Sequence, residues 1–215
     1  MVSKEAFFMV CTNKIKFKME KIWDENDIID KPSVIKLIDT QANEINFKQP
    51  SDDLSGALLR IIVASKLSGN FLELGTGAGR STAWILQAMD KNSQLISVES
   101  DAKLIAIARN IFSDDTRLIL LEEIGETVLE RQSPNSFDIV FADTWPGKYN
   151  HLEEALNLVK IGGFYIIDDM LPQPNWPDGH DLKVKNLVEI LENDVRFRLL
   201  KMEWASGIII LVRVK

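Results

Sequence analysis

The sequence predicts an α/β fold: a doubly wound, mostly parallel sheet of seven strands that ends in an antiparallel hairpin, with extra helices at the N-terminus. Short apolar runs alternate with amphipathic stretches of helical length from residue 71 to residue 191. This alternation is typical of a parallel sheet with helices on both faces. The last two apolar runs, 196–204 and 207–214, are separated only by Ala205 and Ser206. Strands joined this tightly pair antiparallel, because parallel neighbours need a crossover connection.

The elements follow in order from the spacing of apolar residues and from the glycines, prolines and polar clusters between them. Strands are expected at the short apolar runs, over residues 71–74, 94–99, 117–121, 137–142 and 164–167. Helices are expected where apolar residues recur at helical spacing, over residues 54–66, 80–89, 102–111, 124–131, 150–160 and 182–191. Gly162 and Gly163 are expected to break the chain before the strand at 164–167.

The beginning of the chain has a different pattern. Apolar residues between 15 and 23 fall at helical spacing, and residues 32–40 indicate the start of a second helix. No linker composition separates this part from the rest. We therefore expect a single domain, in which residues 1–48 form a helical cover on a core that spans residues 49–215.

Composition and charge narrow the classes of function. The chain has 215 residues, of which 46% are hydrophobic and 27% charged, as in globular proteins. Its net charge of −7 gives no overall basic surface, so no nucleic-acid partner is expected. A single cysteine, Cys11, excludes an intrachain disulfide and a cysteine-based zinc cluster. No apolar run approaches the ~18 residues of a membrane helix, and the apolar stretch 6–11 is too short for a secretory signal, so we expect a soluble, cytoplasmic protein without a membrane partner.

The most specific motif lies between the strand expected at 71–74 and the helix expected at 80–89. It reads Glu73-Leu-Gly75-Thr-Gly77-Ala-Gly79-Arg-Ser81. Glycines let the backbone turn tightly and approach a ligand closely. The N-terminus of the following helix presents free N–H groups to an anionic group. We assign the motif to cofactor binding, the alternative being a flexible turn without a ligand.

Glu99 ends the next expected strand, 94–99. An acid at this place can accept hydrogen bonds from both hydroxyls of a ribose. Alone it could be a solvated loop acid; beside the glycine motif, it and its neighbour Ser100 are candidates for binding a nucleoside-type ligand. The pattern Glu-x-Gly-x-Gly-x-Gly differs from the dinucleotide pattern Gly-x-Gly-x-x-Gly. It suits a ligand that carries an ammonium and a sulfonium in place of a pyrophosphate.

At these residues the chain resembles the class I S-adenosylmethionine-dependent methyltransferases, whose first motif has this form and whose Rossmann-like sheet also ends in an antiparallel hairpin. The resemblance covers roughly residues 50–215. Within that class the chain is similar to the catechol and caffeoyl-CoA type O-methyltransferases. The segments that match them are the glycine motif, 98–99, 137–143, Tyr149 and 162–169. The resemblance implies an enzyme that moves a methyl group from S-adenosylmethionine to an oxygen of a small-molecule acceptor.

The resemblance also implies roles for single residues in cofactor binding. Ser81 would hold the methionine carboxylate and Glu99 the ribose. Glu123, after the third strand, would border the adenine. Asp143 would lie beside the methionine end and Trp145 beside the adenine.

A divalent metal is implied in the same way, held by Asp143, Asp168 and Asp169. Carboxylates at the ends of adjacent strands converge where open α/β sheets bind ligands. Ligation by oxygen alone suits Mg²⁺, Ca²⁺ or Mn²⁺ rather than zinc. The alternative, in which Asp143 is a structural or cofactor-side acid and the other two residues cap loops, carries equal weight.

The sequence leaves the catalytic base open. The family has a lysine three residues after the first aspartate, but Pro146 occupies that position here and Lys148 comes two residues later. His180 is a second candidate, because histidine titrates near neutral pH. It ends the proline-rich segment 170–180, in which Trp176 offers a flat apolar face. The alternative is an ordinary loop with His180 at a helix start by chance.

Two other functions stay open at this stage. One is a nicotinamide-dependent oxidoreductase on the same scaffold. The glycine spacing and the terminal hairpin argue against this alternative. The other is a non-catalytic nucleoside-binding protein, which the missing family lysine keeps open. The resemblance implies a homodimer, and the sequence does not identify the acceptor.

Overall fold

The computed structural model describes residue 24 and residues 27–28, 30–174 and 176–215. Within these ranges the helices are α1 (Ile35–Glu44), α2 (Asp53–Ala64), α3 (Arg80–Ala88), α4 (Ala102–Ile111), α5 (Gly125–Arg131), α6 (Leu152–Leu158) and α7 (His180–Asn193). The strands are β1 (Asn70–Leu74), β2 (Gln94–Glu99), β3 (Leu118–Glu122), β4 (Phe137–Ala142), β5 (Val159–Ile167), β6 (Phe197–Met202) and β7 (Ile208–Arg213). Every element expected from residue 54 onward is present, with ends shifted by a few residues.

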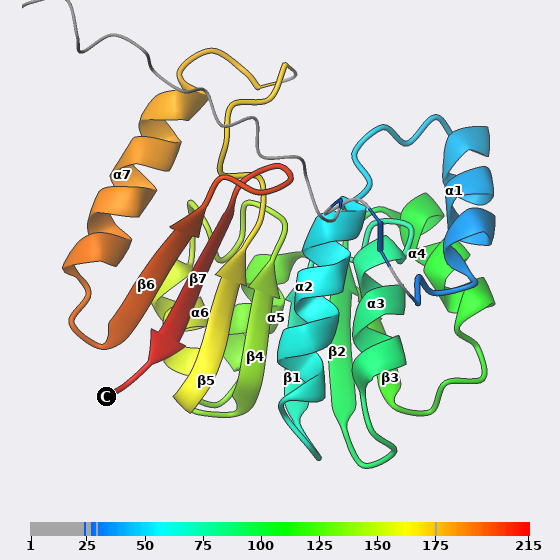
Figure 1. The fold of residues 1–215 in the computed structure, drawn as a ribbon, viewed down its shortest axis with the longest axis horizontal. Helices are drawn as coiled ribbons and strands as arrows, with labels where there is room; N and C mark the ends of the chain where they lie inside the picture. Colours follow the sequence, from blue (N-terminus) through cyan, green and yellow to red (C-terminus); the bar gives the residue numbers. More distant parts are fainter. Residues whose placement is uncertain (1–23, 25–26, 29, 175) are drawn as a thin grey trace, which may run out of the picture.

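The strands form one sheet in the order β3-β2-β1-β4-β5-β7-β6 (Figure 1). Strands β1 to β5 pair in parallel, whereas β7 pairs antiparallel with both β5 and β6. This confirms the predicted doubly wound sheet with a C-terminal antiparallel hairpin. The strand order reverses beside β1, and open α/β sheets bind ligands at such a reversal, outside the carboxyl ends of the strands.

Helices cover both faces of the sheet (Figure 1). On one face Leu59 of α2 forms an apolar cluster with Phe141 of β4. On the other, Leu129 of α5 and Leu187 of α7 cluster with Val140. The neighbours Val140 and Phe141 belong to different clusters because successive side chains of a strand point to opposite faces. Burying each such side chain contributes about 1.5–3 kcal/mol, so both layers of helices stabilise the sheet.

The region around Gly162 and Gly163 corrects the sequence expectation. The helix expected over 150–160 ends at Leu158, and β5 already begins at Val159, so the two glycines lie inside the strand and do not precede it. The register between β4 and β5 shifts at this point, as in a β-bulge. Gly162 has φ +78°, a conformation that favours glycine, so the pair shapes the strand and does not interrupt it.

Part of the N-terminal cover is described. Helix α1 lies beside α4 (Figure 1), and its buried Ile35 and Ile38 form one apolar cluster with Trp84 of α3 and Leu104 of α4. The amphipathic helix expected between residues 15 and 23 lies outside the described residues. None of the helices in the described ranges combines the length and the apolarity that crossing a membrane demands.

Helix α2 packs on α3 so closely that Gly56 has no room for a side chain. A Cβ at Gly56 would lie 2.2 Å from Cδ1 of Trp84, whose ring is fully buried. We expect Gly56→Ala to lower the free energy of unfolding by about 1–3 kcal/mol, because overpacking displaces side chains or backbone. Urea denaturation measures this. Ile61→Ala, on the exposed face of the same helix, is the control and should change stability by less than about 0.5 kcal/mol. Equal stability of Gly56→Ala and wild type would contradict the packing argument.

Candidate active site

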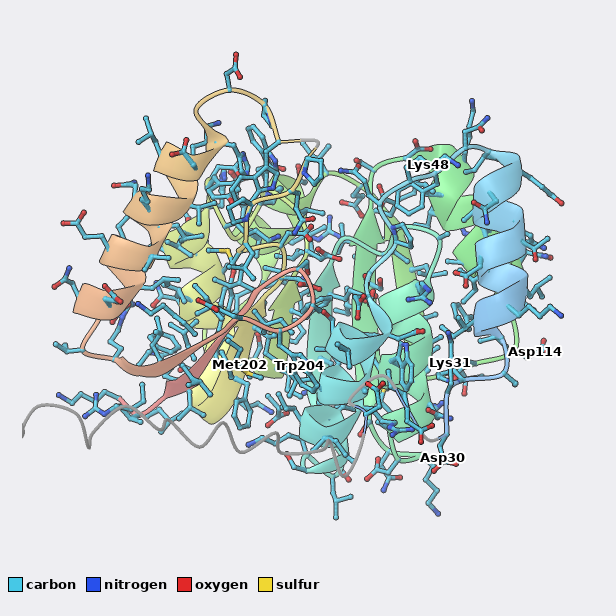
Figure 2. The ribbon with its side chains drawn as sticks, turned by 45° about the horizontal axis from the view of Figure 1, so that its top comes forward. Asp30, Lys31, Lys48, Asp114, Met202 and Trp204 are labelled. Carbon is cyan, nitrogen blue, oxygen red and sulfur yellow. The ribbon has the colours of Figure 1, made fainter. Side chains whose placement is uncertain are left out.

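A cavity of about 930 Å³ opens at the carboxyl edge of the sheet. The loops that follow β1, β2, β4 and β5 line one side of it, and α1 with residues 47–52 lines the other. Lys48 of this segment lies beside α1 at the rim of the molecule (Figure 2). The volume is that of a small-molecule site, and the place is where open α/β sheets bind ligands.

The loop between β1 and α3 is made of glycines that adopt positive φ angles: Gly75 at +103°, Gly77 at +53° and Gly79 at +100°. Such angles favour glycine. A Cβ at Gly75 would in addition lie 2.6 Å from the methyl group of Thr144. Gly75 and Gly77 line the cavity. Gly79 is placed differently, since a Cβ there would meet the Phe112 ring. The loop therefore presents bare backbone to the cavity.

Glu99 is held with its carboxylate at the cavity wall. Oε2 accepts a hydrogen bond from the N–H of Gly77 at 2.9 Å, and Oε1 accepts one from the N–H of Asp101 at 2.9 Å. Hydrogen bonds to a charged acceptor are the stronger kind, so they hold the carboxylate in place. Each carboxylate oxygen can accept more than one hydrogen bond. Glu99 can therefore bind hydroxyl groups of a ligand without losing its own supports.

Glu73 and Ser81 lie beneath the glycine loop, away from the cavity. Glu73 is fully buried, and its Oε2 accepts hydrogen bonds from Thr82 Oγ1 at 2.6 Å and from Ser97 Oγ at 2.5 Å. Burial raises the pKa of Glu73, while the nearby hydroxyls, that of Ser81 included, oppose the rise. Neither Glu73 nor Ser81 is among the residues that line the cavity. Their place in the structure is that of a support for the loop.

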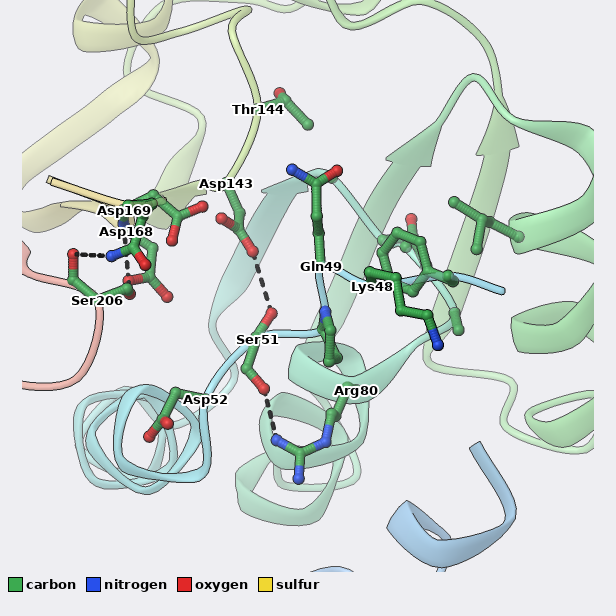
Figure 3. Close-up of a pocket in the computed structure, with 18 of the residues that line it drawn as sticks. Lys48, Gln49, Ser51, Asp52, Arg80, Asp143, Thr144, Asp168, Asp169 and Ser206 are labelled. Carbon is green, nitrogen blue, oxygen red and sulfur yellow. Dashed lines mark hydrogen bonds between the residues drawn. The ribbon is translucent and has the colours of Figure 1, made fainter. Parts of the chain in front are cut away.

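Three aspartates and a lysine meet at the ends of β4 and β5. Figure 3 shows Asp143, Asp168 and Asp169 gathered on one side of the cavity. Lys148, which is 5% exposed, donates a hydrogen bond to the main-chain oxygen of Asp168 at 2.8 Å, and its Nζ lies 3.9 Å from Oδ1 of Asp143. The chain turns back at Gly147, which has φ +84°. This turn brings Lys148, which lies two residues beyond the position of the family lysine, close to the three aspartates.

The aspartates are anchored and crowded by charge. Ser51 Oγ donates to Oδ2 of Asp143 at 3.0 Å, while Ser206 Oγ and the N–H of Asp169 donate to Oδ1 of Asp168 (Figure 3). Burial, assisted by the charge of Asp168, raises the pKa of Asp143 well above its usual range, although the lysine opposes this. Burial also raises the pKa of Asp168. The group holds more negative charge than the lysine balances, so a further cation or a proton would stabilise it.

Beside the aspartates, four rings form what we call the aromatic wall: Trp145, Tyr149, Trp176 and His180, all of which line the cavity. The ring centroid of His180 lies 4.6 Å from that of Trp176, 5.1 Å from that of Tyr149 and 5.8 Å from that of Trp145. Nζ of Lys183 lies 4.0 Å from the Trp145 ring centroid, a cation–π contact. Flat apolar faces of this kind suit a planar ligand.

Sequence reasoning missed the segment 47–52 and its anchor Arg80. Residues 47–52 line the cavity, although the sequence analysis identified no motif there. The Arg80 guanidinium donates to the main-chain oxygen of Ser51, pairs with Asp53 at 2.9 Å and pairs with Asp39 of α1 at 3.0 Å. These partners are distant in sequence, so no local pattern could have revealed them.

The cavity brings together most of the residues that the sequence singled out. Those that line it are Gly75, Gly77, Glu99, Asp143, Trp145, Lys148, Asp168, Asp169 and His180. Those that do not line it are Glu73, Gly79, Ser81, Ser100 and Glu123. Glu123 forms an ion pair with Arg131. The role of each residue in binding or catalysis stays a prediction.

The expected metal site also stays a prediction. Within the part of the chain that the structure describes, no three histidine, cysteine, aspartate or glutamate side chains are grouped as ligands of a metal ion. Oδ1 of Asp168 and Oδ2 of Asp143 are engaged by serine hydroxyls.

Comparisons with known proteins agree with this geometry. A family model described as a methyltransferase domain matches residues 72–170. A "probable O-methyltransferase" of Mycobacterium tuberculosis is 26% identical over 170 residues, which cover 74% of this chain and 75% of that protein. The crystal structure of an O-methyltransferase from Bacillus cereus in complex with S-adenosylhomocysteine has a TM-score of 0.75 at 20% identity and covers 88% of this chain and 94% of its own. That of the O-methyltransferase TomG from Streptomyces achromogenes, in complex with S-adenosylmethionine, has a TM-score of 0.76 at 16% identity, with 89% and 94% covered.

Fold, cavity and similarities agree with the class I S-adenosylmethionine-dependent methyltransferases that the chain resembles in sequence. The curated relatives that the chain matches include mycobacterial proteins named "putative" or "probable" O-methyltransferase. The matched domain contains the glycine loop, Glu99 and the three aspartates.

The raised pKa of Glu73 makes stability depend on pH. The folded protein holds this proton more tightly than the unfolded chain, so stability falls as pH rises from the usual value of 4.5 through the folded pKa, and above that pKa the penalty is constant. We expect Glu73→Gln, which keeps an oxygen for Thr82 and Ser97 but removes the charge, to be more stable than wild type at about pH 7.5. The difference should vanish near about pH 4.

Urea denaturation at both pH values measures this difference. Glu122→Gln, at an exposed position, is the control and should change stability little at either pH. A Glu73→Gln variant that is less stable than wild type at the higher pH would contradict the assignment of an unfavourable buried charge.

Proposed function

We propose that the protein transfers the methyl group of S-adenosylmethionine to an oxygen atom of a small planar acceptor. The observation that supports this best is that one cavity joins Glu99 and the glycine loop, which suit the donor, to the aspartates, Lys148 and the aromatic wall, which suit the acceptor. With a volume of about 930 Å³, the cavity has room for both the methyl donor and a small acceptor.

For the donor, we propose that Glu99 accepts hydrogen bonds from the ribose hydroxyls. Leu104 and Phe47 line the same cavity and offer apolar surface to the adenine. The bare backbone at Gly75 and Gly77 leaves space for the methionine part. The acidic character of the cavity favours a donor that carries a sulfonium and an ammonium.

The reaction is an in-line displacement: the acceptor oxygen forms a bond to the methyl carbon as the bond from sulfur to that carbon breaks, which leaves S-adenosylhomocysteine. The protein contributes mainly by positioning the two reactants. We propose that Lys148 receives the proton of the acceptor hydroxyl. Lys148 can do so only as a neutral amine, which it becomes by passing one of its own protons to the neighbouring carboxylate of Asp143 or to solvent before the acceptor reacts.

We propose that a divalent cation binds at Asp143, Asp168 and Asp169. The chemistry of the donors supports this, because all are oxygens, and so does their charge, because three carboxylates lie near one lysine. The three side chains are not grouped as ligands in the described residues, so binding would require them to move together. When bound, the cation would lower the pKa of the acceptor hydroxyl. Lys148 and the aromatic wall would act on the acceptor in addition to the cation, while Ser51 and Ser206 hold the carboxylates in place.

The donor assignment predicts the behaviour of Glu99→Gln. We expect affinity for S-adenosylhomocysteine to fall roughly 10- to 100-fold, because hydrogen bonds to a charged carboxylate are replaced by weaker ones. Isothermal titration calorimetry, with Mg²⁺ and with EDTA, measures this. Glu122→Gln is the matched control, because Glu122 ends the neighbouring strand, pairs with Arg109 and does not line the cavity. Unchanged affinity in Glu99→Gln would remove the ribose assignment.

The base assignment predicts the behaviour of Lys148→Met. We expect kcat to fall roughly 10²- to 10⁴-fold, the usual contribution of a positioned proton acceptor, with affinity for S-adenosylhomocysteine preserved. Lys148→Arg keeps the positive charge but cannot give up its proton in the working pH range. If Lys148→Arg retains activity near that of wild type, the lysine acts as a fixed charge and not as a base.

A further inference from the structure

The segment between α1 and α2 forms one wall of the cavity without secondary structure of its own. Residues 47–52 line the cavity, and no helix or strand lies between Glu44 and Asp53 in this described stretch. Among the described residues, the hydrogen bonds that fix residues 48–51 are those of Ser51. Contacts with other elements must therefore hold this wall in place.

Ser51 is held from two sides. Its main-chain oxygen accepts a hydrogen bond from Nη1 of Arg80 at 2.5 Å, and its hydroxyl donates one to Oδ2 of Asp143 at 3.0 Å (Figure 3). Arg80 is the first residue of α3 and directly follows the glycine loop, whereas Asp143 follows β4. Ser51 is therefore tied both to the helix behind the glycine loop and to the acidic group.

The guanidinium of Arg80 binds three elements at once. Besides the Ser51 oxygen, it binds Asp39 of α1, where Nε donates to Oδ1 at 3.0 Å, and Asp53 of α2, whose Oδ1 lies 2.9 Å from Nη2. The Arg80 side chain is 13% exposed, so solvent screens these ion pairs less than pairs at the surface. A lysine could keep only part of this set, because its ammonium is a compact point charge and not a planar fork.

The other end of the segment contacts the glycine loop. A Cβ added to Gly77 would lie 3.4 Å from Cζ of Phe47, so the Phe47 ring packs against backbone that carries no side chain. The N–H of Gly77 donates to the carboxylate of Glu99. Phe47, Gly77 and Glu99 all line the cavity. The place of the Phe47 ring relative to Glu99 therefore depends on how the segment is held.

Resting on the proposed function, we propose that Arg80 is a positioning residue for donor binding: it fixes residues 47–51 against the glycine loop and so places Phe47 where the nucleoside part of the donor binds. Ordering a loop at the moment of binding costs affinity. A wall that Arg80 has already fixed avoids this cost. Arg80 acts through the segment, and its own contacts are with the protein.

The alternative is that Arg80, which also lines the cavity, binds the carboxylate of the donor's methionine part directly. The contacts of the guanidinium favour the positioning role. Each of its three nitrogens has a partner in the protein, and two of these partners are the carboxylates of Asp39 and Asp53. A donor carboxylate would have to compete with them.

The first test needs no ligand. Cys11 is the only cysteine of the chain, so Cys11→Ser with Lys48→Cys gives one site for a nitroxide spin label, on an exposed residue of the segment. We expect the electron paramagnetic resonance spectrum of the label to sharpen when Arg80→Lys is added, because the segment moves more freely. Arg109→Lys, which loses only a surface pair with Glu122, is the control. An unchanged spectrum in Arg80→Lys would overturn the positioning role.

The second test compares two ligands by calorimetric titration: S-adenosylhomocysteine, which carries the amino-acid carboxylate, and 5′-methylthioadenosine, which lacks it. In Arg80→Lys we expect both dissociation constants to rise roughly tenfold and by the same factor, because the wall meets the nucleoside part that the two ligands share. Arg80→Met should act in the same direction and more strongly. Arg109→Lys should change neither constant.

Asp39→Asn separates the two roles further. If Arg80 positions the segment, loss of this partner weakens the binding of both ligands, and the double variant with Arg80→Met binds no worse than Arg80→Met alone. If Arg80 binds the donor carboxylate, Asp39→Asn frees the guanidinium, so S-adenosylhomocysteine binds as well as before or more tightly.

The outcomes distinguish this inference from the proposed function. Failure of the wild type to bind S-adenosylhomocysteine would end the proposed function itself. If the wild type binds it and Arg80→Lys loses affinity for S-adenosylhomocysteine but not for 5′-methylthioadenosine, Arg80 contacts the donor carboxylate and the positioning role is overturned. An equal loss for both ligands, together with the sharpened spectrum, supports it.

Discussion

The parallel pairing of β1 with β2 and β4 is the interaction on which the rest of the site depends. Leu74 at the end of β1 is in register with Val98 of β2 and with Ala142 of β4. Because parallel strands in register end at one edge, the residues that follow them emerge together: the glycine loop, Glu99 and Asp143. Helices on both faces bury the sheet and keep this edge as the open one (Figure 1). The position of the cavity is therefore set by the order of the strands, and the side chains then determine what it can bind.

A second constraint is electrostatic. Burial stabilises the sheet, but it also raises the free energy of charged groups near the sheet's edge. For this reason it raises the pKa of Glu73, Asp143 and Asp168. The protein offsets this with hydroxyls from Ser51 and Ser206 and with the lysine beside the aspartates. Under the glycine loop, hydroxyl groups stabilise the buried carboxylate of Glu73. At the three aspartates, the hydroxyls and the lysine leave a surplus of negative charge. Perturbed carboxylates in a cleft are typical of functional sites, which accords with the reaction that we propose there.

How far the sequence could predict the protein depends on the range of the interactions. Apolar periodicity and turn residues predicted the strands and helices, and the strand–loop–helix motif around Gly75 predicted the donor side, because these signals lie within a few consecutive residues. The bulge of β5 at Gly162 was misread as a chain break, since a glycine pair has the same local pattern in both cases. The contacts of Arg80 with the segment 47–52 could not be predicted from the sequence, because they join residues far apart along the chain.

The sequence by itself determined the fold class, the glycine loop with Glu99, and the presence of three aspartates after adjacent strands. The tertiary structure alone decided which of the candidates face the cavity. It placed Glu73 and Ser81 under the loop, and it returned Lys148 to the aspartates although its spacing departs from the family pattern. It also brought Tyr149 and His180 into hydrogen-bond contact across a gap of 31 residues. The physical reason is that local patterns fix the conformation of the backbone, whereas the direction and burial of a side chain depend on what the rest of the chain packs against it.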